Sequence, residues 1–149
     1  MYTMIEFRQA NVDDFTQALA LNAILRGIDD NDDVRRIRAA SGVAVVAVDG
    51  QRVVGFGVAY PWCGEAPRSD EMFPQGSGCV WWQLDDVVVD PSYRGKGVGS
   101  RLVRDLVRQG EGYGTAKTCP AKSSTSFAAH QGFRASQADA GTGLWERSI

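Results

Sequence analysis

The chain has 149 residues, of which 44% are hydrophobic, and its 16 basic and 18 acidic residues leave a formal net charge of −2. This length and composition predict a single globular domain over residues 1–149. No basic block is present to neutralise a nucleic-acid backbone, and no apolar run approaches the roughly 20 residues needed to span a bilayer. We expect a cytoplasmic protein that binds neither nucleic acid nor membrane, and we leave a homodimer open.

Side chains that bind metals are few and scattered. Cys63, Cys79 and Cys119 form an odd set without a CxxC pair, and His130 is the one histidine. This pattern indicates neither a disulfide framework nor a zinc site. We therefore expect no metal.

The first half of the chain predicts one strand, two helices and a hairpin. Asn11 precedes a stretch with helical apolar spacing and is a candidate N-cap. Asp49 and Gly50 form a turn typical of a tight hairpin between two apolar runs. The expected elements are a strand at 3–10, helices at 11–27 and 28–41, and antiparallel strands at 43–48 and 52–60.

The second half alternates strands with helices after a long loop. Residues 61–78 contain three of the five prolines and no periodicity, which is typical of a surface loop. Residues 97–108 carry an apolar stripe opposite charged residues, which predicts an amphipathic helix. The remaining expected elements are strands at 79–90 and 113–119, a short helix at 122–131 and a closing hairpin at 132–136 and 143–148.

A glycine-rich stretch, Arg94-Gly95-Lys96-Gly97-Val98-Gly99, lies between a predicted strand and a predicted helix. Backbone N–H groups and the positive end of the helix dipole meet at such a junction, so it predicts an anion site. The stretch has no Gly-Lys followed by Ser or Thr, which disfavours a Walker loop. Its GxGxG spacing also departs from the GxGxxG of dinucleotide folds.

The segment "LDDVVVDPSYRGKGVGSRLV" resembles the central strand and pyrophosphate-binding signature of the GNAT superfamily of acyl-CoA-dependent N-acyltransferases. "IEFRQANVDDF" and "FAAHQGF" resemble the family's first strand and a later helix, in the same order. The resemblance implies an α/β (α+β) fold with a mixed, mostly antiparallel sheet of six to seven strands flanked by helices. It also implies a CoA cleft between the fourth and fifth strands.

The resemblance further implies acetyl-CoA as cosubstrate. Backbone amides of the glycine stretch would hold the pyrophosphate, with charge added by Arg94 and Lys96, and the central strand would bind the pantetheine arm. A tight turn without a ligand is the alternative, but such a turn would need one glycine rather than three. The residues expected to bind the cosubstrate are Val87, Val88, Val89, Arg94, Gly95, Lys96, Gly97, Val98, Gly99 and Ser100.

Two acids in the central strand are the catalytic candidates. In a regularly alternating strand, Asp85 and Asp86 would point to opposite faces. The resemblance places a general base at Asp85 and an oxyanion-binding backbone N–H near Val88. Pairing of both acids with nearby arginines is an equally weighted alternative.

The family's usual general acid is missing. Ala128 stands at its usual tyrosine position, and Ala121 stands where an asparagine is often found. Water is one substitute for the missing proton donor. The side-chain substitutes are Tyr113, Cys119, Ser124, Ser126 and His130.

The acceptor is less determined. The acidic cluster at 28–33 is better explained as a solvated turn and helix start than as a site for a cationic amine. The tryptophans at 62, 81 and 82 are better explained as anchors than as a cation cage. We predict acetyl transfer to a primary amine of a small molecule or protein. The alternatives are a catalytically degenerate acyl-CoA-binding regulatory module and a phosphate-binding module unrelated to CoA.

Overall fold

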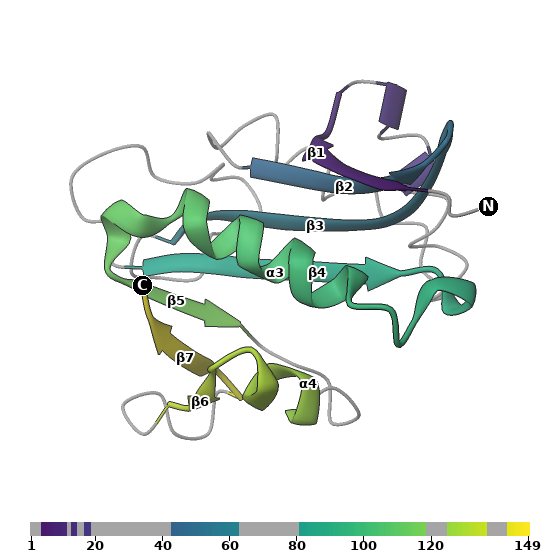
Figure 1. Ribbon diagram of the computed structural model, residues 1–149. Helices are drawn as coiled ribbons and strands as arrows, with labels where there is room; N and C mark the ends of the chain where they lie inside the picture. Colours follow the sequence, from purple (N-terminus) through teal and green to yellow (C-terminus); the bar gives the residue numbers. More distant parts are fainter. Residues whose placement is uncertain are drawn as a thin grey trace.

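In the part of the chain that the structure describes, seven strands form one sheet in the order β1-β2-β3-β4-β5-β7-β6 (Figure 1). The computed structural model describes residues 4–11, 13–14, 17–18, 43–62, 81–118, 125–136 and 143–149, with the backbone alone at 62, 85 and 86. The strands are β1 (Ile5–Gln9), β2 (Val43–Asp49), β3 (Arg52–Trp62), β4 (Trp81–Val89), β5 (Thr115–Thr118), β6 (Arg134–Ala135) and β7 (Trp145–Ser148). The helices are α3 (Val98–Gln109), α4 (Thr125–His130) and the short 3-10 turns η1 (Pro91–Tyr93) and η2 (Glu111–Tyr113).

Every strand pair in this sheet is antiparallel except β4 and β5. A parallel pair needs a crossover, and here α3 supplies it between the two strands. The mixed, mostly antiparallel sheet expected from the sequence is therefore confirmed. β1 and β7 belong to this one sheet, so strands from both ends of the sequence share it.

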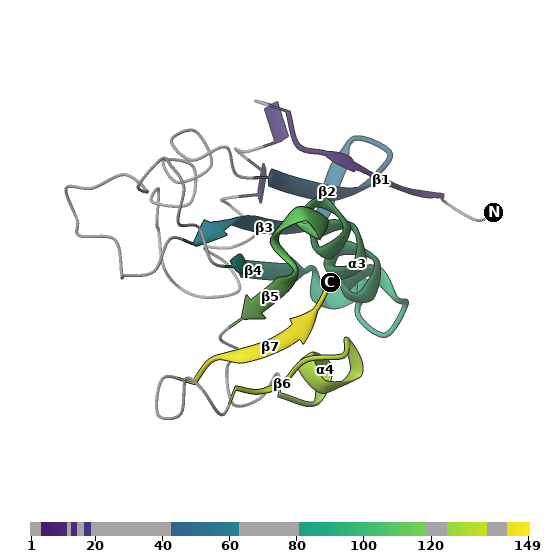
Figure 2. The same cartoon turned by 90° about the vertical axis from the view of Figure 1, so that its left-hand side faces the viewer.

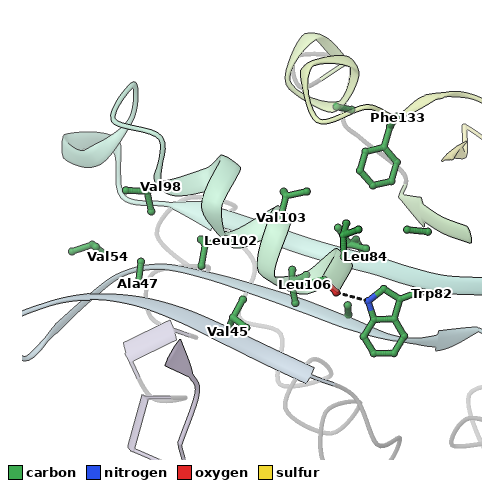
Figure 3. Close-up of a cluster of buried hydrophobic side chains, with 14 residues drawn as sticks. Val45, Ala47, Val54, Trp82, Leu84, Val98, Leu102, Val103, Leu106 and Phe133 are labelled. Carbon is green, nitrogen blue, oxygen red and sulfur yellow. Dashed lines mark hydrogen bonds between the residues drawn. The ribbon is translucent and has the colours of Figure 1, made fainter. Parts of the chain in front are cut away.

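Helix α3 packs on one face of the sheet, and α4 lies on the same side (Figure 2). The predicted apolar stripe is the buried face of α3, because its five apolar side chains contact the core while its charged ones face outward. Figure 3 shows this stripe above the apolar side chains of β2, β3 and β4. The buried residues of α3 are Val98, Leu102, Val103, Leu106 and Val107.

Two glycines and one tryptophan set how closely α3 approaches the sheet. A Cβ added at Gly55 on β3 would lie 3.1 Å from the Leu102 side chain, and one at Gly110 would lie 2.3 Å from the Trp82 ring. The Trp82 indole donates a hydrogen bond of 2.8 Å to the carbonyl of Leu106 (Figure 3). The ring also stacks on Tyr113, so Trp82 is an anchor of the core, as expected.

A second apolar cluster covers the opposite face of the sheet. Ala18, one of the described residues of the first predicted helix, packs into it. Its buried members from the sheet are Ala44, Val46, Val48, Val53, Phe56, Val58, Tyr60 and Val88.

Most predicted elements are confirmed within two or three residues of their ends. One boundary is wrong: Pro61 and Trp62 belong to β3, where they pair with Trp82 and Trp81, rather than beginning the long loop. Pairing with β4 overrides the turn preference of proline here. The predicted helix at 28–41, most of the helix at 11–27 and the remainder of the loop lie outside the described residues. No helix in the described part of the chain is long and apolar enough to cross a membrane.

The first helix begins with a reciprocal cap. The side chain of Asn11 accepts a hydrogen bond of 3.1 Å from the backbone N–H of Asp14, and the Asp14 carboxylate accepts one of 2.7 Å from the N–H of Asn11. This confirms Asn11 as N-cap. The Arg8 guanidinium donates to the same carboxylate at 3.0 Å, and this bond holds the pKa of Asp14 below its usual value.

We expect Asp14→Asn to lower the free energy of unfolding at pH 7 by about 1–3 kcal/mol, because Arg8 and the Asn11 N–H lose a charged partner. Since the folded pKa of Asp14 is lowered, its stabilisation is complete above the unfolded-state pKa of about 3.9 and is lost as the pH falls through the folded value. Urea unfolding between pH 7 and pH 3 should show the difference from wild type shrinking toward low pH. A difference that is constant with pH would contradict this.

Candidate functional site

The glycine stretch forms the connection between β4 and α3. After β4 ends at Val89, the chain passes through η1 and reaches Gly95 and Gly97, whose φ angles are +75° and +82°. Such angles favour glycine because they strain other residues. Gly97 is the N-cap of α3, and a glycine has no side chain that could accept hydrogen bonds from the first N–H groups of the helix. The first N–H groups of α3 lack partners within the helix by geometry, so its start suits an anion.

The surface at these two glycines is open. A Cβ added at Gly95 or Gly97 would meet no atom of the described residues within 4 Å. Arg94 and Lys96 alternate with the glycines and are exposed. The residues present therefore fit a large anionic group such as a diphosphate. Such a group can approach the backbone of Gly95 and Gly97, beside the basic side chains of Arg94 and Lys96.

Gly99 serves a different purpose from Gly95 and Gly97. A Cβ at this position would lie 3.2 Å from the ring of Phe127 and 3.5 Å from the side chain of Val89. Gln131 next to α4 also donates a hydrogen bond of 2.8 Å to the Ser100 hydroxyl. Gly99 and Ser100 thus dock α4 against the first turn of α3. Val98 is buried in the core, so only its backbone is available to a ligand.

The strands β4 and β5 diverge beside this loop (Figure 1). Their parallel pairing covers only Trp82 to Leu84 on β4, opposite Ala116 to Thr118 on β5. β4 continues to Val89 and keeps β3 as its neighbour on the other side. Among the described residues, no strand pairs with the β5-facing edge of residues 85–89. The predicted parting of the fourth and fifth strands is confirmed.

Asp85 is the extra residue of a β-bulge. On β3 the consecutive residues Val58 and Ala59 pair with Asp86 and Leu84, so Asp85 has no residue opposite it. Burial shows the same shift: Trp82 and Leu84 face the α3 core before the bulge, whereas Val87 and Val89 do so after it. Regular alternation along β4 is therefore broken between Leu84 and Val87.

The position expected to carry the family's tyrosine lies in the core. Ala128 on α4 is buried in the cluster that includes Phe133. Ser126 and His130 are exposed on the same helix. Tyr113 stacks on Trp82 and follows the C-terminal end of α3, whereas Gly97 lies at its N-terminal end. Ala121, Cys119, Ser124 and the acids at 28–33 lie outside the described residues.

Sequence reasoning missed the side chains that hold the loop between β4 and the glycines. Asp49 and Arg52 on the β2–β3 hairpin bind Tyr93 and Asp90 respectively. These partners are 44 and 38 residues apart in sequence, so no local pattern points to them. It also missed Lys117 on β5, a largely buried lysine whose ammonium lies 4.2 Å from the centre of the Trp81 ring. In the described residues, no group of His, Cys, Asp and Glu side chains is arranged to hold a metal.

These features together define an α+β protein with a glycine loop at the end of β4, beside the strand edge that β5 does not cover. A family model described as "Acetyltransferase (GNAT) domain" matches residues 40–135. The chain therefore belongs to the GNAT acetyltransferase family. A comparison with curated protein sequences gives no match.

Solved structures share the fold over most of the chain. A GNAT family acetyltransferase from Brucella melitensis in complex with acetyl-CoA is 19% identical, with a TM-score of 0.68 over 99% of this chain and 90% of that one. The Escherichia coli GNAT family N-acetyltransferase YhbS in complex with CoA is 17% identical, with a TM-score of 0.72 over 99% and 83%. An aminoglycoside N-acetyltransferase in complex with CoA is 20% identical, with a TM-score of 0.68 over 89% and 93%.

The two kinds of glycine predict different outcomes for the same substitution. Gly99→Val should destabilise the fold by about 1–3 kcal/mol by pushing on Phe127, and Phe127→Ala in the same chain should recover part of that loss. Gly97→Val should cost about 1–2 kcal/mol through its positive φ, with no recovery from Phe127→Ala. Thermal unfolding of the single and double variants measures both, and equal recovery in the two pairs would contradict the assignment.

Proposed function

We propose that this chain transfers an acetyl group from acetyl-CoA to a primary amine. The observation that carries the proposal is the position of the glycine loop and the uncapped start of α3 at the end of β4, beside the edge that β5 leaves open. An extended cosubstrate with a diphosphate at one end and a thioester at the other matches this arrangement. Membership of the GNAT acetyltransferase family supports the same cosubstrate.

The binding roles follow from what each residue offers. The open backbone at Gly95 and Gly97 would approach the diphosphate, and Arg94 and Lys96 would add positive charge. The edge of β4 at residues 87–89 would hydrogen-bond the pantetheine arm as a missing strand would. The N–H groups proposed to bind the diphosphate belong to Gly95, Lys96, Gly97, Val98, Gly99 and Ser100.

The chemistry requires an amine that loses a proton, a polarised carbonyl and a proton for the leaving thiolate. We assign the general base to Asp85 and keep Asp86 as the second candidate. The bulge at Asp85 supports this assignment, because bulges are enriched next to active sites. The backbone N–H near Val88 is the proposed oxyanion donor.

The proposed acceptor is a primary amine on a small molecule or a protein. One structural neighbour is an aminoglycoside N-acetyltransferase, which makes aminoglycosides one class to test. We also propose that residues 1–149 form one domain. This is supported by the shared sheet, which takes strands from both ends of the sequence.

A second candidate is a module that binds acyl-CoA without turnover. Ala128 favours it, because this buried side chain has no proton to give to a thiolate. The two candidates share the diphosphate loop and differ only in the transfer step.

Calorimetry should show binding of acetyl-CoA and CoA but no comparable binding of ATP, which lacks the pantetheine arm. Thiol release in the same sample, with a panel of polyamines, aminoglycosides, amino acids and peptides, then tests transfer. Release that depends on an amine supports the transferase, whereas tight binding with no release across the panel supports the regulatory module. If neither acetyl-CoA nor CoA binds, both candidate functions are rejected.

Asp85→Asn should slow transfer most at low pH, where the acceptor amine is most protonated and depends most on a base. The defect should shrink as the pH rises and free amine accumulates. A pH–rate profile of kcat/KM for the acceptor measures this, and the same profile for Asp86→Asn tests the second candidate. A profile parallel to that of wild type would remove Asp85 as the base.

A further inference from the structure

The segment between β4 and the glycine loop is tied to the β2–β3 hairpin by two side-chain contacts. Arg52 donates a hydrogen bond of 2.6 Å to the carboxylate of Asp90, and the Tyr93 hydroxyl donates one to the carboxylate of Asp49. Asp49 and Arg52 face each other across the hairpin turn. Both contacts therefore come from the residue pair that flanks the hairpin turn.

Asp90 links this hairpin to the backbone of η1. Its carboxylate accepts a hydrogen bond of 2.9 Å from the N–H of Ser92, and its own N–H donates one of 2.8 Å to the carbonyl of Val54. The Ser92 N–H and the charge of Arg52 lower the pKa of Asp90, so this carboxylate stays ionised at neutral pH. The chain leaving β4 is thus held before it reaches the first glycine.

Tyr93 is held at three points. Its hydroxyl binds Asp49, and this bond raises the pKa of the phenol. Its backbone N–H donates to the carbonyl of Asp90 at 2.8 Å. The Lys96 ammonium lies 5.3 Å from the centre of its ring, a cation–π distance. The Tyr93 side chain therefore connects the hairpin to Lys96, which lies between Gly95 and Gly97.

We propose that Tyr93 is a positioning residue for the diphosphate of the CoA cosubstrate, and that Asp49 acts through it. Gly95 and Gly97 have no side chains to restrain the loop, so its conformation must be set from outside. The hydrogen bond to Asp49 fixes the position at which the loop begins, and the Tyr93 ring positions the Lys96 ammonium. A loop ordered before binding does not have to be ordered by the ligand. This inference rests on the proposed function.

Tyr93→Phe keeps the ring under Lys96 and removes only the bond to Asp49. We expect its Kd for CoA to rise by about two- to tenfold, as for the loss of one hydrogen bond. Tyr93→Leu also removes the ring and should weaken CoA binding further. Asp49→Ala should match Tyr93→Phe, and the double variant should be no weaker than either single one. Calorimetry with CoA measures each Kd.

A second donor separates positioning from general damage to the fold. S-acetylpantetheine carries the thioester but no diphosphate, so its KM and kcat should be unchanged in Tyr93→Phe, while the KM for acetyl-CoA rises at unchanged kcat. Asp14→Asn is the matched control, because it removes a carboxylate tether between β1 and the start of the first helix and leaves the partners of Asp90 and Tyr93 in place. It should lower thermal stability and leave the Kd for CoA as in wild type.

The outcomes separate this inference from the proposed function. Both Tyr93 variants could bind CoA as tightly as wild type and show only a lower thermal stability. In that case the hydrogen bond between Tyr93 and Asp49 supports the fold alone, and the inference is wrong. A loss of equal size with S-acetylpantetheine would also overturn it. If wild type does not bind CoA, the proposed function fails first, and the inference fails with it.

Discussion

The parallel pairing of β4 with β5 stops after three residue pairs, and the rest of the site depends on that limit. β3 holds β4 along its whole described length, so the strand stays extended while one edge loses its neighbour. Backbone groups on such an edge need partners, and a ligand can supply them. The bulge at Asp85 falls directly after the last pair, where the strand changes from a paired to an open edge.

The position of α3 makes this open edge useful. Gly55 lets the helix approach β3, and Gly110 makes room for the Trp82 ring near the other end of the helix. The bond from Trp82 to the Leu106 carbonyl fixes the helix against β4 itself. The helix is therefore held near both of its ends, with Gly97 at the start of its first turn.

The sequence predicts what local spacing determines and little of what distant contacts determine. The stripe of α3, the Asp49–Gly50 turn and the cap at Asn11 follow from neighbours within a few residues. The bulge at Asp85 depends on how β3 pairs with β4, and the bond from Tyr93 to Asp49 joins segments that approach only in the folded chain. The packing of Gly99 on Phe127 is also a contact between distant segments. The sequence does not predict it, because the glycine motif suggests a ligand at Gly99 instead.

In the proposed function, binding and chemistry rest on different parts of the molecule. The start of the glycine loop is held by Asp49 and Arg52 of the β2–β3 hairpin, and the first turn of α3 also contacts α4 through Gly99 and Ser100. Ala128 contributes packing beside Phe133 and offers no proton. In the proposed reaction, the thiolate would then take its proton from water or from another side chain. Deprotonation of the amine would be the step in which this chain's own acids matter most.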